Sequence, residues 1–103
     1  MRKLCDLSDI PLTQARGFSV KGGPIVIYRD ADGVYGYRDS CPHLGIDLAW
    51  NPNSFMDAES RHIQCSTHGA LLEPRTGECV FGPCIGQHLQ PVEIELRDGE
   101  VWG

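Results

Sequence analysis

The sequence predicts an all-β fold, a small antiparallel β-sandwich or barrel. Two Asp-Gly pairs, Asp32-Gly33 and Asp98-Gly99, each separate segments in which apolar and polar residues alternate, as in a β-hairpin. The 12 glycines and seven prolines among 103 residues favour short strands and shaped loops over long helices. No segment of helical length repeats its apolar residues with a period of 3.6.

The first hairpin is predicted around Asp32-Gly33. Residues 24–29 before the turn are rich in β-branched side chains, which favour strands. Residues 34–38 after the turn alternate between larger and smaller or polar side chains. We therefore expect two paired strands here.

The second hairpin is predicted around Asp98-Gly99. Residues 92–96 alternate aliphatic side chains with glutamate, and residues 101–102 follow the turn, so one face should be buried and the other acidic and solvated. Shorter segments complete the prediction: strands at residues 17–20, 61–64, 70–72 and 78–81, a turn at Thr76-Gly77, and one helical turn after Ser8 that ends at Pro11.

Composition sets limits on the class of protein. We expect a single domain over residues 1–103, because no linker or repeat interrupts the chain. No apolar run is long enough to span a membrane, and no apolar segment follows the basic start, so we expect a cytoplasmic protein without a membrane partner. The net charge of −5 would repel nucleic acid. Five cysteines, an odd number, do not fit a fully paired extracellular framework.

Two short motifs contain the candidate metal-binding residues. Cys41-Pro42-His43 and, after the 21 residues 44–64, Cys65-Ser66-Thr67-His68 each place one thiol close to one imidazole. Thiolate and imidazole are the side chains that bind zinc, copper and iron. The candidate metal ligands are therefore Cys41, His43, Cys65 and His68.

The mixed composition of each motif bears on the choice of metal. Structural zinc sites commonly pair cysteine with cysteine and histidine with histidine, although a tetrahedral zinc ion can also accept a mixed set. A cluster of two irons explains the mixing better, because the two cysteines can hold one iron and the two histidines the other. Glycine near each histidine would let backbone N–H groups approach bridging sulfides.

These motifs resemble the Rieske family of [2Fe–2S] proteins, whose pattern is Cys-x-His, a variable spacer and Cys-x-x-His-Gly. A third loop with Gly-Pro covers the cluster in that family, and Gly82-Pro83 matches it. The resemblance extends over about residues 24–101. It implies an antiparallel β base domain with a two-loop cluster-binding lobe, and a [2Fe–2S] cluster whose cofactor-binding and metal ligands are Cys41, His43, Cys65 and His68.

The resemblance implies a soluble ferredoxin, a one-electron carrier between a flavin reductase and a terminal oxygenase or reductase. Because the electron moves by outer-sphere transfer, we expect no catalytic residue, and we expect the protein to be a monomer. One alternative is the small electron-transfer subunit of a reductase such as nitrite reductase, although many such subunits have lost their ligands. Another is a zinc-binding interaction module.

Two departures from the high-potential members of the family predict a low reduction potential. Ile46 and Thr67 occupy the positions at which those proteins carry an additional disulfide. Ala70 and Leu72 replace a serine and a tyrosine that donate hydrogen bonds to the cluster sulfurs, and neither can donate. We therefore expect a potential toward the low end of the Rieske range, which runs from roughly −150 to +300 mV.

Other polar residues receive ordinary structural interpretations. We expect His62 and His88 to be sheet or surface residues, and Cys5 to fill space in the core. Cys79 and Cys84 lie five positions apart and could form a disulfide, but in a reducing compartment we expect two free thiols.

The spacer between the motifs is longer than is usual in dioxygenase ferredoxins, and residues 51–57 form the added loop. Trp50, Phe55 and Met56 are the large apolar residues of this region. Two interpretations remain open for them: an exposed rim where a partner docks, or packing beneath the loop.

Overall fold

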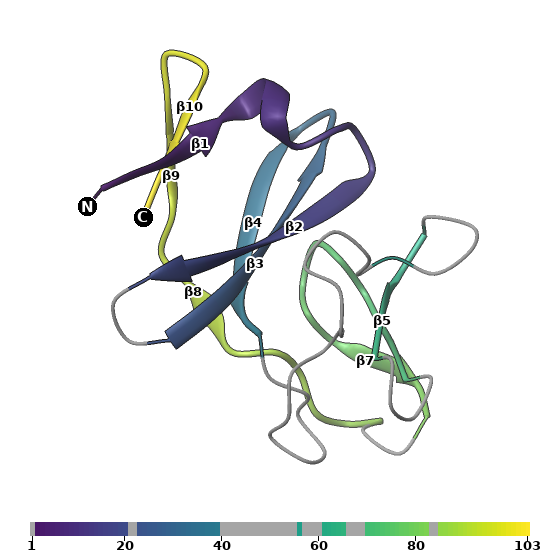
Figure 1. The fold of residues 1–103 in the computed structure, drawn as a ribbon. Helices are drawn as coiled ribbons and strands as arrows, with labels where there is room; N and C mark the ends of the chain where they lie inside the picture. The colour runs from purple at the N-terminus through teal and green to yellow at the C-terminus, as the bar shows by residue number, and fades with distance from the viewer. Residues whose placement is uncertain (1, 21–22, 40–55, 57–60, 66–69, 83–84) are drawn as a thin grey trace.

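The structure is a computed structural model that describes residues 2–20, 23–39, 56, 61–65, 70–82 and 85–103. In this part of the chain every regular element is a strand, apart from one 3₁₀ turn, η1 (Leu7–Asp9). The ten described strands form three antiparallel sheets (Figure 1). The prediction of an all-β antiparallel fold is confirmed. Among the described elements no helix is long and apolar enough to cross a membrane.

The central sheet has four strands in the order β2-β3-β4-β8. These are β2 (Gln14–Val20), β3 (Gly23–Asp30), β4 (Gly33–Arg38) and β8 (Pro91–Val92). The hairpin predicted around Asp32-Gly33 is the β3–β4 pair, in which Asp30 lies opposite Gly33. Alternate residues of β3 enter two different cores, which explains why residues 24–29 are almost continuously apolar.

The terminal sheet pairs the two ends of the chain. Its strands are β1 (Lys3–Asp6), β9 (Glu95–Arg97) and β10 (Glu100–Trp102), in the order β1-β10-β9. The Asp98-Gly99 turn joins β9 to β10 with positive φ at both residues, 50° and 75°, as a two-residue hairpin turn requires. Arg2 and Gly103 exchange two backbone hydrogen bonds, so the termini lie side by side (Figure 1). The terminal core beneath this sheet contains Ile10, Ile25, Ile27 and Val101.

The prediction of one strand over residues 92–96 is wrong. The chain leaves the central sheet after β8 and joins the terminal sheet at β9. Between the two strands, Ile94 packs over Gly36, where a Cβ atom would lie 3.0 Å from the Ile94 Cγ2 atom. Val92 and Ile94 are half-buried, whereas Leu96 on β9 is 43% exposed. The alternation of the sequence therefore follows burial only as far as the change of sheet, and it cannot show which strand each half pairs with.

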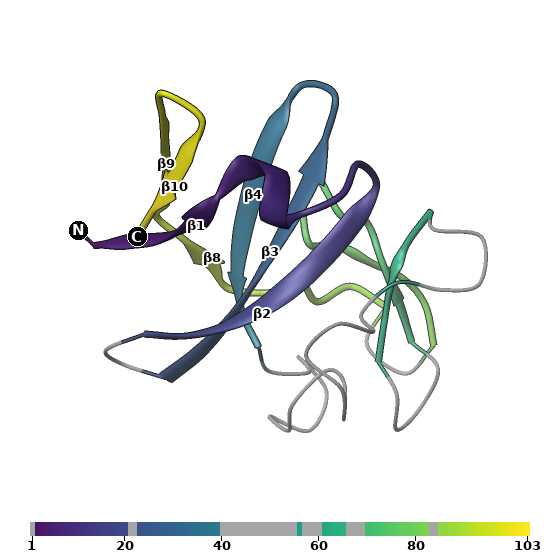
Figure 2. The same ribbon diagram turned by 45° about the horizontal axis from the view of Figure 1, so that its top comes forward.

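The lobe sheet is the third sheet, formed by β5 (Ile63–Gln64), β6 (Leu71–Leu72) and β7 (Cys79–Phe81) in sequence order. It lies at the end of the molecule opposite the termini (Figures 1 and 2). The short strands predicted near residues 61–64, 70–72 and 78–81 are confirmed. The lobe core combines buried residues of this sheet with residues of the central sheet, namely Ala15, Val26, Tyr28, Tyr37, Ile63, Cys65, Ala70, Leu72, Cys79 and Leu89.

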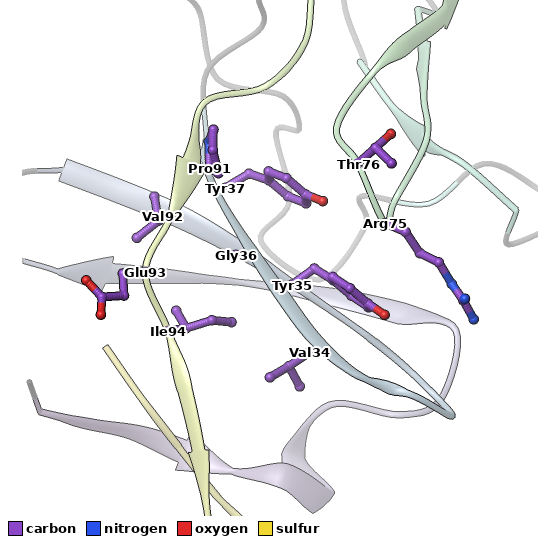
Figure 3. A pocket seen from close by; sticks show the side chains of 10 residues that line it. All are labelled: Val34, Tyr35, Gly36, Tyr37, Arg75, Thr76, Pro91, Val92, Glu93 and Ile94. Atoms are coloured by element: carbon purple, nitrogen blue, oxygen red, sulfur yellow. The ribbon is translucent and has the colours of Figure 1, made fainter.

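The turn between β6 and β7 attaches the lobe sheet to the central sheet. The Tyr37 hydroxyl donates a hydrogen bond of 2.8 Å to the Pro74 carbonyl. Arg75 Nε lies 2.6 Å from Asp30 Oδ2, and Arg75 Nη2 lies 3.0 Å from Asp32 Oδ2. Figure 3 shows Tyr35 and Tyr37 extending from β4 toward this turn. These contacts fix the position of the lobe relative to the base of the domain.

Candidate metal centre

Of the four predicted ligands, the structure describes Cys65. It directly follows β5, is fully buried and belongs to the lobe core. Cys41, His43 and His68 lie outside the described residues. A buried thiol at the end of a strand is held by its neighbours, so its sulfur has a fixed position from which to bind a metal.

The second motif occupies the connection of a β-hairpin. Ile63 pairs with Leu72 and Gln64 with Leu71, so β5 and β6 run antiparallel up to this connection. One step further, the Cys65 N–H donates a 2.9 Å hydrogen bond to the Ala70 carbonyl. Cys65, the first residue of the motif, and Ala70, which follows the motif, are therefore adjacent and hydrogen-bonded to each other.

Gly82 lies directly against the end of the second motif. Its φ is +99°, and a Cβ atom built on it would lie 2.9 Å from the Ala70 Cα atom. Only glycine combines this backbone conformation with so close an approach. Gly82 thus lies beside Ala70, the residue that follows the second motif, and Pro83 lies outside the described residues.

These features fit an iron–sulfur centre. The donor is a buried thiol, which can bind iron as a thiolate. The hairpin that carries it is closed by a backbone hydrogen bond, and a glycine lets a second segment approach within van der Waals distance. Among the described residues there is no group of three or more His, Cys, Asp or Glu side chains that could hold a metal ion elsewhere.

Large apolar side chains are exposed next to Gly82. Phe81 and Ile85 are 61% and 66% exposed, and Val80 on the same strand is 46% exposed. Sequence analysis missed these residues, although their position on either side of Gly82-Pro83 was a usable signal. Met56 is half-buried, bridges to Ile63 and packs against the lobe core, which supports packing beneath the loop for this residue. Trp50 and Phe55 lie outside the described residues.

The remaining histidines have ordinary surroundings. His62 is half-buried just before β5, and His88 is exposed, pairs with Glu78 through a backbone bridge and has its Nδ1 atom 3.3 Å from the Leu89 carbonyl. Both are sheet-edge or surface residues, as the sequence predicts.

Two cysteines outside the motifs differ from each other. Cys5 is half-buried, and burial, with smaller contributions from the Asp9 and Asp6 carboxylates, raises the pKa of its thiol. Cys79 is buried in the lobe core and is disulfide-bonded. The expectation of a free thiol at Cys79 is therefore wrong, and Cys84 lies outside the described residues.

An open groove of about 350 Å³ lies where the β6–β7 turn meets the central sheet (Figure 3). Tyr35, Tyr37 and Arg75 line one part of it, and Glu93 and Ile94 line another. Burial raises the pKa of Tyr37 to about 12, which keeps its hydroxyl protonated and able to donate to Pro74. Cys65 is not among the described residues that line the groove, which lies where the lobe is attached to the central sheet.

The described fold is that of a small antiparallel β domain whose three-stranded lobe carries a buried cysteine where a hairpin closes. The family model described as the Rieske [2Fe-2S] domain matches residues 1–95. The chain belongs to this family, and the cofactor of the family is a Rieske-type [2Fe–2S] cluster. The predicted cofactor is thereby confirmed, and the zinc alternative loses its basis.

Known proteins agree with this assignment. The chain is 27% identical over 93 residues to the cytochrome b6-f complex iron-sulfur subunit 2 of Nostoc sp. strain PCC 7120, covering 87% of this chain and 48% of that protein. The chain thus spans about half the length of the curated relatives it matches.

Two solved structures share the fold over nearly the whole chain. The ferredoxin of carbazole 1,9a-dioxygenase from Nocardioides aromaticivorans IC177 superposes with a TM-score of 0.78 at 24% identity, covering 97% of this chain and 92% of that one. A chain from the complex of reduced oxygenase and oxidized ferredoxin in carbazole 1,9a-dioxygenase gives a TM-score of 0.76 at 29% identity, covering 97% and 88%. Solved structures of similar size therefore have this architecture.

Proposed function

We propose that the protein is a one-electron carrier of the ferredoxin type. The observation that carries the proposal is the arrangement around Cys65: a buried thiol, a hairpin connection closed onto Ala70, and Gly82 packed against that closure. This arrangement belongs to a family defined by a one-electron cluster.

Four residues would hold the cluster: Cys41 and Cys65 one iron, and His43 and His68 the other. Each imidazole must be neutral at the nitrogen that binds, and each thiol must be deprotonated. When bound, the cluster supplies reversible uptake of one electron at a potential between roughly −150 and +300 mV. The role of the chain is to fix these four donors and to limit the access of water.

The residues near Cys65 support a low potential within that range. Ala70 and Leu72 are fully buried and lack a hydroxyl group. Neither side chain can donate a hydrogen bond to a cluster sulfur, and such bonds stabilise the reduced state. We place the protein among low-potential carriers for this reason.

The acceptor of the electron is a terminal oxygenase, and the donor is a flavin reductase. This assignment is supported by the similarity to the ferredoxin of a dioxygenase and to a chain from an oxygenase–ferredoxin complex. The exposed Phe81 and Ile85 flank Gly82 and would present an apolar contact surface to the acceptor beside the cluster. That the protein is cytoplasmic and that it is a monomer are both still predictions.

Coulometric titration of the anaerobically purified protein tests this function. We expect uptake of one electron per chain, followed by quantitative return to an oxidised acceptor. A protein that takes up no electron, or that takes up electrons and cannot return them, would contradict the role of a carrier.

A further inference from the structure

The dipeptide Asp-Gly occurs at two hairpin turns, Asp32-Gly33 and Asp98-Gly99. An aspartate followed by glycine can rearrange without an enzyme, because the glycine amide nitrogen can attack the side-chain carboxyl carbon of the aspartate and close a succinimide ring. Glycine favours the attack, since it has no side chain to hinder it. A Cβ atom built on Gly33 or on Gly99 would meet nothing within 4 Å, so steric access does not distinguish the two sites.

Hydrogen bonds protect the first pair. The Gly33 N–H donates to Asp30 Oδ1 at 3.1 Å, so the attacking nitrogen is held by another carboxylate. The Asp32 N–H donates to the same Asp30 oxygen at 2.8 Å, which fixes the backbone before the glycine. Asp32 Oδ2 lies 3.0 Å from Arg75 Nη2. Ring closure at this turn must therefore release both the Gly33 N–H and the Asp32 carboxylate from their partners.

The second pair has no such protection. Asp98 and Gly99 are both exposed, and Asp98 has a φ of 50°, in the left-handed region that a residue with a side chain rarely adopts. In the part of the chain that the structure describes, neither the Asp98 carboxylate nor the Gly99 N–H has a hydrogen-bond or ion-pair partner. Gly99 is bound through its carbonyl oxygen, which accepts a 2.8 Å hydrogen bond from the Leu7 N–H, so its nitrogen stays free.

We propose that Asp98-Gly99 is a site of spontaneous aspartate isomerisation and that the contacts of Asp30 and Arg75 prevent the same reaction at Asp32-Gly33. The Gly99 nitrogen bonds to Asp98 Cγ, and the amide proton leaves with the hydroxyl group of the protonated carboxyl as water. A second water molecule then opens the ring. Cleavage of the new N–Cγ bond restores aspartate, and cleavage of the original peptide bond leaves isoaspartate, whose chain runs through Cγ.

Isoaspartate at residue 98 would disturb the terminal sheet. It adds one carbon atom to the main chain, and a two-residue turn that keeps Arg97 opposite Glu100 has no room for it. The Leu7 hydrogen bond to the Gly99 carbonyl depends on the same turn. The lobe sheet lies at the opposite end of the molecule (Figure 1), so it should not change.

Peptide mapping of the aged full chain tests the site. The native protein is incubated at neutral pH and digested with trypsin, which cleaves after Arg29, Arg38 and Arg97 and so releases residues 30–38 and 98–103, each with one Asp-Gly pair. Isoaspartate changes the retention time of a peptide and leaves its mass unchanged. The isomerised fraction of 98–103 should exceed that of 30–38 by about tenfold, the order of effect expected for one hydrogen bond. Equal fractions, or a larger fraction in 30–38, would overturn the proposal.

Two controls separate the structure from the dipeptide sequence. In urea, where the protecting contacts are lost, both peptides should isomerise at similar rates; a preference for 98–103 that persists in urea would show that the fold is not its cause. In folded Arg75→Ala the fraction in 30–38 should rise and that in 98–103 should stay the same. An unchanged fraction in 30–38 would contradict the protection by Arg75, and a rise in both peptides would show that the variant had lost the fold.

Amide hydrogen exchange tests the consequence. In aged protein the amides of Arg2, Leu7 and Gly103, which are hydrogen-bonded in or beside the terminal sheet, should exchange faster than in fresh protein. The Cys65 amide in the lobe should keep its rate, and unchanged exchange at all four would show that the turn tolerates isoaspartate. None of these measurements involves the cluster, so a failure of the proposed function would leave them standing.

Discussion

The backbone of Gly82 touches Ala70 so closely that a Cβ atom at residue 82 would lie 2.9 Å from the Ala70 Cα atom. Ala70 is the residue at which the hairpin connection of the second motif closes. This contact therefore joins the segment after β7 to the segment that carries Cys65, beside the candidate metal centre.

Gly82→Ala should destabilise the protein by about 2–4 kcal/mol, because it combines an unfavourable φ with a backbone clash. Gly86→Ala is the matched control: Gly86 has a φ of +93°, but a Cβ atom there meets nothing within 4 Å. It should cost only about 1 kcal/mol. Urea unfolding gives both values, and iron per chain should fall in Gly82→Ala alone. Equal losses of unfolding free energy in the two variants would show that the close contact with Ala70 does not add to the cost of Gly82→Ala.

Asp30 should matter more than Asp32, although both contact Arg75. The Asp30 carboxylate is buried, and its Oδ1 atom also accepts hydrogen bonds from the Asp32 and Gly33 amides. Asp30→Asn should cost about 1–3 kcal/mol. Asp32 is largely exposed, so Asp32→Asn should cost less than about 1 kcal/mol. Denaturant titration of both variants tests this, and the reverse order would contradict the anchoring role of Asp30.

Tyr37 should make stability depend on alkaline pH. Its pKa rises from an ordinary value near 10 to about 12 in the folded state because the ring is buried. The neutral hydroxyl is favoured by folding, so its contribution is complete below about pH 10 and is lost as the pH rises toward 12. Thermal unfolding should show this loss in wild type and in Tyr35→Phe. Tyr37→Phe should lack that component and be weaker by about 1 kcal/mol at neutral pH, since Pro74 loses its donor.

Ala70→Ser should raise the cluster potential. The added hydroxyl can donate a hydrogen bond to a cluster sulfur, which stabilises the reduced state. Ala15→Ser makes the same chemical change in the lobe core, but on β2 of the central sheet. EPR-monitored redox titration should show an upward shift in Ala70→Ser and none in Ala15→Ser. A potential that stays constant or falls in Ala70→Ser would exclude Ala70 from the surroundings of the cluster.

Local signals predicted most of the fold. An Asp-Gly turn and a run of β-branched residues such as 24–29 determine local backbone structure from a few adjacent residues. Both hairpins could therefore be identified directly from the sequence. The split of residues 92–96 between two sheets was not predictable in this way, because alternation reports burial and not the pairing partner. Strand β1 was missed because its four residues show no clean alternation.

The family was predicted from the spacing of the two motifs, and the contacts around Cys65 were not. The Cys-x-His and Cys-x-x-His motifs are local, and the Rieske family they indicated is the family of the chain. The contact between Gly82 and Ala70 and the ion pair between Arg75 and Asp30 join segments far apart in the sequence. Such contacts depend on how the lobe packs on the central sheet, which no local pattern specifies. The disulfide at Cys79 was missed because the expectation of a free thiol rested on the compartment alone.

The central claim is that Cys65 and the three other motif residues hold a two-iron cluster. The most direct measurement is iron, zinc and acid-labile sulfide per chain in anaerobically reconstituted protein, together with the EPR spectrum before and after reduction. The account predicts two iron and two sulfide ions, no zinc, a red-brown colour, and an EPR signal that appears only on reduction. A colourless, iron-free protein, or a Cys65→Ser variant that keeps the full cluster, would contradict it.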